Sequence, residues 1–156
     1  MPTVHKLDLS SEENAGDVWR LQHAAYRIEA ELIGVPDLPP LHDTIASLQA
    51  ADETFWGCRD DDGELIGAIA AERADDGTAV ISRMMVHPEH FREGVATALI
   101  GHLLAQWPDA ASWEVTAEAR NRPAIALYER FGFQSEASFK PRDDITMITM
   151  RRPART

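Results

Sequence analysis

The sequence is poor in cysteine, and this scarcity excludes two kinds of site. Cys58 is the single cysteine among 156 residues, so the chain has no internal disulfide and no zinc site built from cysteines alone. It lies in TFWGCR, which has the composition of a β-strand, and we expect a packed thiol rather than a nucleophile. No bound metal is expected.

Long hydrophobic runs are also missing. No stretch approaches the roughly 18 apolar residues that span a bilayer, and the opening MPTVHKLDLSSEEN lacks the apolar core of a signal peptide. We therefore expect a cytoplasmic protein with no membrane partner. With 44% hydrophobic residues in a chain of 156, the composition predicts one globular domain over residues 1–156.

Positive charge is scarce. The chain has 15 Lys and Arg against 26 Asp and Glu, which gives a net charge of −11. The field of such a chain repels polyanions, so we expect no nucleic acid partner, whereas a cationic molecule is attracted. An acidic surface that serves solubility alone would show the same excess of charge.

The two common glycine-rich nucleotide motifs are absent as well. Neither GxxxxGK[ST] nor GxGxxG occurs, which disfavours a P-loop kinase and a Rossmann dehydrogenase. Internal repeats and low-complexity linkers are also missing.

What the chain does contain is an alternation of strand and helix patterns. Residues 4–9 alternate like a strand, and Ser11 begins a helix whose apolar residues recur every three or four positions. The run PDLPPLHDT ends this helix, and Asp43 or Thr44 caps a second helix that reaches about residue 51. The stripe expected to be buried on the first helix comprises Val18, Leu21, Ala25, Ile28 and Leu32.

The rest of the chain continues this alternation. The turns DDDG and DDG join three successive strands, which predicts an antiparallel meander, and GFQSEASF and DITMITMR close the chain as two further strands. The order is β-α-α-β-β-β-α-β-α-β-β. Between the second helix and the closing strands, the expected elements are strands at 54–59, 64–73, 78–86 and 112–117 and helices at 94–107 and 121–132.

One of these helix starts has a chemical signature. HPEHFREGVATALIGHLL passes from a polar run straight into an apolar helix, with the small residues Gly94 and Ala96 at the junction. The free N–H groups and positive dipole end of a helix N-terminus suit an anion, and small residues let the anion approach the backbone. Glycine is also common at helix starts for structural reasons, so this feature alone does not decide.

Two segments together, RMMVHPEHFREGVATALI and NRPAIALYERFGF, resemble the GNAT superfamily of acetyl-CoA-dependent N-acetyltransferases. Members have an apolar strand ending in V-x-P, then [QR]-x-x-G-x-[GA] opening a helix, and later N-x-x-A-x-x-L-Y-x-x-x-G-F. Phe91 departs from this pattern, because it stands where the family has Gln or Arg, and Arg92 follows it. The matching residues are Val86, Pro88, Gly94, Ala96, Asn121, Ala124, Leu127, Tyr128, Gly132 and Phe133.

The resemblance implies a GNAT-like fold of the α/β (α+β) class, with a mixed, mostly antiparallel central sheet of about seven strands and four helices. It also implies that acetyl-CoA is the co-substrate: backbone N–H groups at the helix start hold its pyrophosphate, and free backbone groups of the preceding strand pair with its pantetheine arm. The residues implied to bind it are Met84, Met85, Val86, Arg92, Gly94, Val95, Ala96, Thr97, Asn121 and Tyr128.

Several of these residues have an equally good structural interpretation. Methionines such as Met84 and Met85 are common in protein cores, and Asn121 is a good helix N-cap. Arg92 fits a solvent-facing loop, and Tyr128 fits a packed aromatic residue.

The resemblance further implies that Tyr128 is a general acid. Attack of a neutral amine on the acetyl thioester gives a tetrahedral intermediate, and its collapse expels a CoA thiolate that a nearby phenol can protonate. Some relatives place a glutamate six residues before the closing valine of the strand, but Val80 occupies that position here. The acceptor of the amine's proton stays open between a water relay and a first-helix carboxylate such as Glu29 or Glu31.

We therefore expect an N-acetyltransferase acting on a primary amine of a small molecule or a peptide, with a non-catalytic acyl-CoA-binding module as the alternative. Residues 26–44 and 139–145 are expected to shape the acceptor pocket. The loop GVPDLPPLHD supplies prolines, two carboxylates and His42, which predicts a stiff, lid-like edge facing a cationic acceptor. The acceptor's identity, the use of longer acyl groups and the oligomeric state, including a homodimer, stay open.

Overall fold

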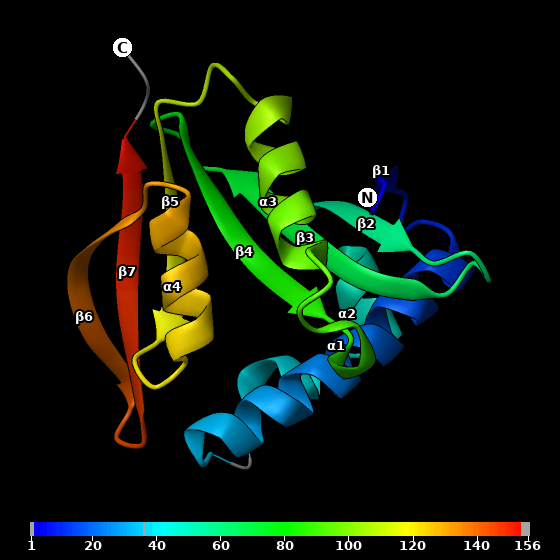
Figure 1. The fold of residues 1–156 in the computed structure, drawn as a ribbon, viewed down its shortest axis with the longest axis horizontal. Helices are drawn as coiled ribbons and strands as arrows, with labels where there is room; N and C mark the ends of the chain where they lie inside the picture. Colours follow the sequence, from blue (N-terminus) through cyan, green and yellow to red (C-terminus); the bar gives the residue numbers. More distant parts are fainter. Residues whose placement is uncertain (1, 36, 154–156) are drawn as a thin grey trace.

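The computed structural model describes residues 2–35 and 37–153, in which one sheet separates two layers of helices (Figure 1). Its seven strands follow the order β1-β2-β3-β4-β5-β7-β6, the expected mixed, mostly antiparallel α/β arrangement. The strands are β1 (Val4–Leu7), β2 (Thr54–Arg59), β3 (Leu65–Arg73), β4 (Thr78–Val86), β5 (Ser112–Glu118), β6 (Gln134–Arg142) and β7 (Ile145–Pro153). The helices are α1 (Glu12–Ile33), α2 (Ile45–Ala50), α3 (Val95–Gln106) and α4 (Arg122–Arg130), with 3-10 helices η1 (Pro39–His42) and η2 (Pro88–His90).

Local sequence signals set the ends of the first two α-helices. The Ser11 side chain caps α1 by accepting the Asn14 backbone N–H, and Gly34 ends the helix with a φ of 74°. Of the two caps considered for α2, Thr44 is the one used, and it forms a reciprocal capping box with Ser47. The predicted order of strands and α-helices is confirmed.

The boundaries differ from the prediction in small ways. β1 ends at Leu7 rather than at residue 9, because the Asp8 carboxylate accepts the Ser10 backbone N–H and turns the chain. The proline-rich run between α1 and α2 contributes η1, and the turn-prone run before α3 contributes η2.

Each face of the sheet has its own helices and its own core. On one face, α3 and α4 bury Val95, Leu99 and Leu127 in a cluster with sheet residues. On the other face, α1 and α2 bury residues such as Val18 and Leu48. Cys58 is fully buried on β2, and burial raises the pKa of its thiol, as expected for a packed cysteine rather than a nucleophile.

The predicted buried stripe of α1 is correct only in its first half. Val18 and Leu21 are buried, but Ile28 is 37% exposed and Leu32 is 53% exposed. The second half of the helix runs past the place where β4 and β5 separate, so its inner side borders a cleft. These apolar residues therefore line a binding space rather than the core.

The separation of β4 from β5 creates this space. The two parallel strands pair from Thr78 and Ser112 up to Ile81 and Val115, and no further pairs follow although both strands continue. Just beyond, the pairing of β3 with β4 shifts register, which leaves Ser82 as an extra residue in β4. Such a bulge bends a strand, and here it accompanies the departure of β4 from its neighbour.

None of the helices in residues 2–35 and 37–153 has the length and hydrophobicity of a transmembrane segment.

Candidate functional site

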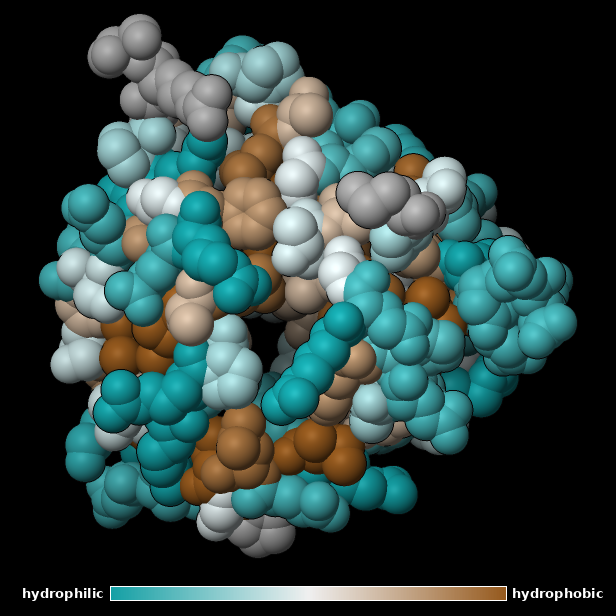
Figure 2. All heavy atoms as spheres, viewed as in Figure 1, coloured by the Kyte–Doolittle hydropathy of each residue, from teal (hydrophilic) through white to brown (hydrophobic). Residues whose placement is uncertain are grey.

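A cleft of about 910 Å³ occupies the gap between the separated ends of β4 and β5. Figure 2 shows it as a hollow at the centre of the molecule, with hydrophobic residues gathered on its lower rim over α1. Its walls come from α1, η1, β4, the start of α3, β5, α4 and β7. All of the residues implied to bind CoA line this cleft. They are Met84, Met85, Val86, Arg92, Gly94, Val95, Ala96, Thr97, Asn121 and Tyr128.

One end of the cleft is the N-terminus of α3. Gly94 is its N-cap residue, with a left-handed φ of 80° and no side-chain cap, and a Cβ added there would meet no atom within 4 Å. Arg92 also has a positive φ, 68°, so the loop turns sharply before the helix. The first-turn N–H groups of α3 are therefore presented to open space, which is the geometry of an anion site.

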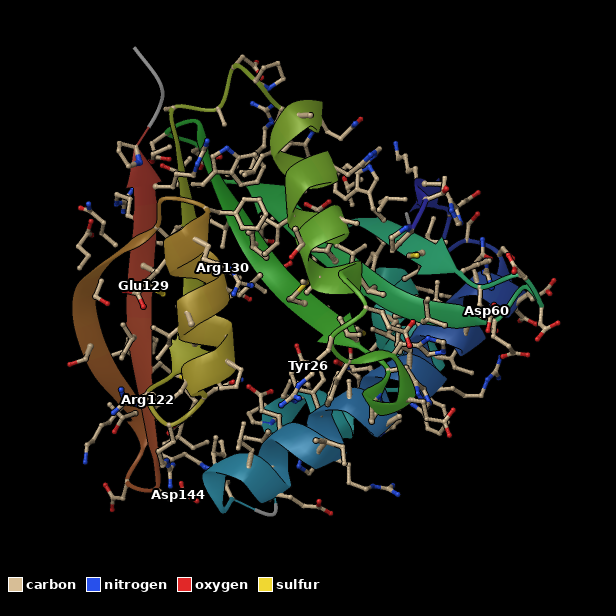
Figure 3. All side chains as sticks on the ribbon, in the orientation of Figure 1. Tyr26, Asp60, Arg122, Glu129, Arg130 and Asp144 are labelled. Carbon is tan, nitrogen blue, oxygen red and sulfur yellow. The ribbon has the colours of Figure 1, made fainter. Side chains whose placement is uncertain are left out.

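The side chains around the start of α3 leave the space for an anion open. Arg92 and Thr97 are exposed, while Val95 is buried in the core beneath the helix. Phe91 is 48% exposed, so the departure from the family pattern places an aromatic ring on the surface of the cleft rather than in the core. Arg130 lies on the side of α4 that faces α3, and it also lines the cleft (Figure 3).

The strand wall of the cleft is β4. The side chain of Met85 is buried in the core on the α1 side, and Met84 and Val86 are half-buried against the other core. The core interpretation of the methionine side chains therefore holds. The backbone of β4 beyond Ile81 borders the cleft and is not paired with β5, which is the arrangement that a pantetheine-binding strand requires.

Two phenols reach the cleft from opposite sides. Tyr128 on α4 is 4% exposed, and its ring lies 5.9 Å from that of Phe133. Tyr26 on α1 donates its hydroxyl to the Met84 carbonyl at 3.4 Å and points from α1 toward β4 (Figure 3). Burial raises the pKa of both hydroxyls, and the nearby Glu29 carboxylate raises both further. Both phenols are therefore protonated donors at neutral pH.

Asn121 makes two contacts at the start of α4. Its side-chain oxygen accepts the Ala124 backbone N–H at 3.3 Å, which is the expected N-cap. Its amide nitrogen donates to the Glu29 carboxylate at 2.7 Å, so the same side chain joins α4 to α1 across the cleft.

The two first-helix carboxylates considered as proton acceptors lie in different places. Glu29 lines the cleft and is half-buried, and its burial raises its pKa. Glu31 is exposed and lies outside the cleft lining. The structure therefore leaves Glu29 as the carboxylate of α1 that borders the site.

Glu118 and Arg130 line the cleft but were not predicted from the sequence, and Tyr26 was predicted only as the first residue of the segment that shapes the acceptor pocket. Glu118 is 3% exposed at the end of β5, and Arg120 and the Thr146 N–H hold its carboxylate by hydrogen bonds. The Arg120 hydrogen bond is the main reason that the pKa of Glu118 falls to about 2. Glu118 is the second glutamate of SWEVTAE, and nothing in the sequence distinguishes it from the first.

The proline-rich loop lines the cleft, but not with its charges. Pro39 and Pro40 are in the lining, as are Pro141 and Ile145 from the second segment expected to shape the acceptor pocket. The expectation that the loop's carboxylates face the acceptor is wrong, because neither carboxylate is in the cleft lining and both have protein partners. Asp43 pairs with Arg83 at 2.8 Å, and Asp37 pairs with His42 and with Arg142 at 3.7 Å.

The profile of the Acetyltransferase (GNAT) family matches residues 17–133 of the chain. The UPF0157 protein YqkA of Bacillus subtilis is 36% identical over 126 residues, which cover 81% of this chain and 36% of that protein. The chain thus spans about a third of this curated relative.

Solved structures share the fold. The ribosomal-protein-S18-alanine N-acetyltransferase from Escherichia coli matches with a TM-score of 0.78 at 19% identity, over 100% of this chain and 96% of that chain. The PaiA N-acetyltransferase from Thermoplasma acidophilum, in complex with coenzyme A, matches with a TM-score of 0.76 at 14% identity, over 98% and 99% of the two chains. With the profile match extending over most of its length, the chain belongs to the GNAT acetyltransferase family.

Proposed function

We propose that the protein is an acetyl-CoA-dependent N-acetyltransferase that transfers the acetyl group to a primary amine by direct attack. One observation carries the proposal: β4 and β5 stop pairing at Ile81 and Val115, beside a helix start with free N–H groups. An extended, amide-rich arm ending in a pyrophosphate fits this combination, because the arm can pair with a strand and the phosphates with a helix N-terminus.

The proposed binding mode uses the backbone more than side chains. The N–H groups at residues 92–97 hold the pyrophosphate, and the small residues Gly94 and Ala96 let it approach. Arg92 and Arg130 supply positive charge near the phosphates in a chain whose net charge is −11. The pantetheine arm pairs with the free end of β4, which directs the thioester toward Tyr128.

The chemical step follows from this placement. The neutral amine attacks the thioester carbonyl carbon, a C–N bond forms, and the C–S bond breaks as the tetrahedral intermediate collapses. Tyr128 donates its proton to the departing thiolate and recovers one from the nitrogen of the intermediate. Burial raises the pKa of Tyr128, so the phenol carries its proton throughout the neutral range and is available as a donor.

The test is a direct assay. Purified protein is incubated with acetyl-CoA and a panel of primary amines, and thiol release is followed with a thiol reagent while mass spectrometry follows the acetylated amine. The expected result is thiol release that depends on the amine and matches the product formed. CoA binding without turnover of any amine would identify a non-catalytic acyl-CoA-binding module instead.

A further inference from the structure

The part of the cleft lined by α1, η1 and β7, which we call the acceptor end, contains one carboxylate that forms no ion pair with any described residue. Glu29 accepts a hydrogen bond from the neutral amide of Asn121, and no basic side chain in residues 2–35 and 37–153 forms an ion pair with it. The other charged groups at this end are paired. Arg120 holds Glu118 at 2.7 Å, and Glu53 and Asp43 hold Arg83.

The surroundings of Glu29 are apolar. On α1 itself, Ala25 and Leu32 lie four and three residues from Glu29, on the same side of the helix, and Ile28 also lines the cleft. Further apolar lining residues come from η1, from the residue before it and from β7. These are Leu38, Pro39, Pro40, Ile145 and Met147. Figure 2 shows the hydrophobic rim that results over α1.

We propose that Glu29, held in place by Asn121, binds the ammonium group of the acceptor, and that the acceptor carries this single charge on an apolar body. The inference rests on the proposed function, because it concerns the second substrate of that reaction. A polycation such as a polyamine is disfavoured, because its further charges would lie against the apolar rim without a counter-ion.

In the proposed reaction, Glu29 also accepts a proton from the acceptor. The acceptor reaches the site as R-NH₃⁺, and a proton passes to the Glu29 carboxylate, which leaves R-NH₂ with the lone pair that attacks the thioester. The second nitrogen proton leaves after attack and replaces the one that Tyr128 gives to the thiolate. Glu29 then releases its proton to solvent, so each turnover yields amide, CoA thiol and one H⁺.

The groups around Glu29 favour this task. Burial and the Glu118 carboxylate raise its pKa, and the Asn121 amide opposes them. The two phenols that also face it, Tyr26 and Tyr128, are neutral donors in the working range. A carboxylate of raised pKa is a better proton acceptor for an ammonium group than an ordinary one.

Asn121 is therefore a positioning residue, and this role is separable from its helix cap. Asn121→Asp retains the oxygen that caps α4 and replaces the amide donor by a second carboxylate next to Glu29. The pKa of Glu29 then rises, so the acidic limb of the kcat/KM profile should move to higher pH, while CoA should still raise the melting temperature as it does for the wild-type protein. An unchanged acidic limb would overturn the positioning role.

The acceptor class is tested with matched amines. Hexylamine and 1,6-diaminohexane have the same length and the same reacting group, and they differ in one terminal charge. We expect kcat/KM to be at least about tenfold higher for hexylamine, and to rise along ethylamine, butylamine and hexylamine by up to about fourfold per buried methylene group. Leu32→Glu, at an exposed rim position, should shift the preference toward the diamine.

The role of Glu29 is tested with Glu29→Gln, and Glu31→Gln is the control on the same helix. The first variant should lower kcat/KM by about 100-fold or more and remove the acidic limb, while CoA still raises the melting temperature. The control should stay within about twofold of wild type, because Glu31 lies outside the cleft lining. Wild-type turnover by Glu29→Gln, or a preference for the diamine in the native protein, would overturn the inference and leave the proposed function standing. If no amine releases thiol, the proposed function itself fails.

Discussion

Tyr26 and Met84, which both line the cleft, are joined by a hydrogen bond in which the phenol of α1 donates to the backbone carbonyl of β4 at 3.4 Å. This hydrogen bond fastens the helix that borders the acceptor end to the strand proposed to hold pantetheine. It occupies one carbonyl of β4, so the proposed pairing with pantetheine uses other backbone groups of that strand.

Removing the Tyr26 hydroxyl should lower the stability of the protein more than it lowers the rate of the reaction. Tyr26→Phe keeps the ring and loses one hydrogen bond, so we expect a loss of about 1 kcal/mol in the free energy of unfolding. Thermal unfolding should show a fall of roughly 2–4 °C, and kcat should fall less than tenfold. A loss of turnover as large as that of the corresponding Tyr128 variant would show that Tyr26 takes part in proton transfer.

Tyr128→Phe isolates the proposed acid. The ring packing beside Phe133 is kept and the proton donor to the thiolate is lost, so kcat should fall by roughly 10²–10⁴-fold at neutral pH. Steady-state kinetics and calorimetric titration with CoA measure the two effects, and CoA affinity should stay nearly unchanged. Full turnover by this variant would leave Tyr128 as a packing residue.

The raised pKa values of Tyr26 and Tyr128 also predict how stability depends on alkaline pH. Burial raises the pKa of both above the value near 10 of an unfolded tyrosine, so the native state holds protons that the unfolded state releases. Their contribution is complete below about pH 10 and is lost as pH rises through the native pKa. Melting temperatures measured from pH 8 to 11 should fall less steeply above pH 10 for Tyr26→Phe and Tyr128→Phe than for wild type, and equal slopes would contradict this.

Gly94 provides the test of the anion site. Gly94→Val puts a branched side chain into the open space in front of α3 at a φ of 80°, so CoA affinity should fall at least about tenfold. Gly63→Val is the matched control, because its φ is 84°, its Cβ also meets nothing within 4 Å, and it lies in the turn before β3. Both should lose a similar amount of thermal stability, but the control should bind CoA like wild type. Equal CoA affinity in both variants would reduce Gly94 to a structural helix start.

Ligand binding itself should be visible as stabilisation. At about 100 times its Kd, a ligand adds about 2.7 kcal/mol to the free energy of unfolding. For a chain of this size, this corresponds to an increase in melting temperature of very roughly 5–10 °C. Thermal unfolding with millimolar CoA measures the shift, and adenosine at the same concentration serves as a control that lacks the pyrophosphate and the pantetheine arm. No shift with CoA would count against the site.

The sequence was sufficient to predict the fold and to indicate motif residues that lie together in one cleft. Periodicity located the strands and helices, and two short motifs pointed to segments that the structure brings to one cleft. Val86, Gly94 and Tyr128 border the same space although they come from three different elements. What each of these residues does in the reaction stays a prediction.

The acceptor half was harder to predict, for physical reasons. A helical apolar period shows that Ile28 and Leu32 share a side of α1, but not whether a core or a cleft lies beneath them. The contact between Asn121 and Glu29 joins residues 92 positions apart, and neither residue type signals it. The carboxylate Asp43 was misjudged because its partner Arg83 lies on a distant strand.

The separation of β4 from β5 divides the sheet into two blocks, β1-β2-β3-β4 and β5-β7-β6. Within the described residues, the strand pairing between these blocks involves residues 78–81 of β4 and 112–115 of β5. A ligand that lies along the free edge of β4 adds the strand segment that the sheet lacks there. Ligand binding then strengthens the contact between the two blocks. Amide hydrogen exchange should therefore slow on binding in both flanking strands, β4 and β5. In the proposed binding mode, the co-substrate therefore stabilises the sheet while it is bound, and this stabilisation is lost when the product leaves.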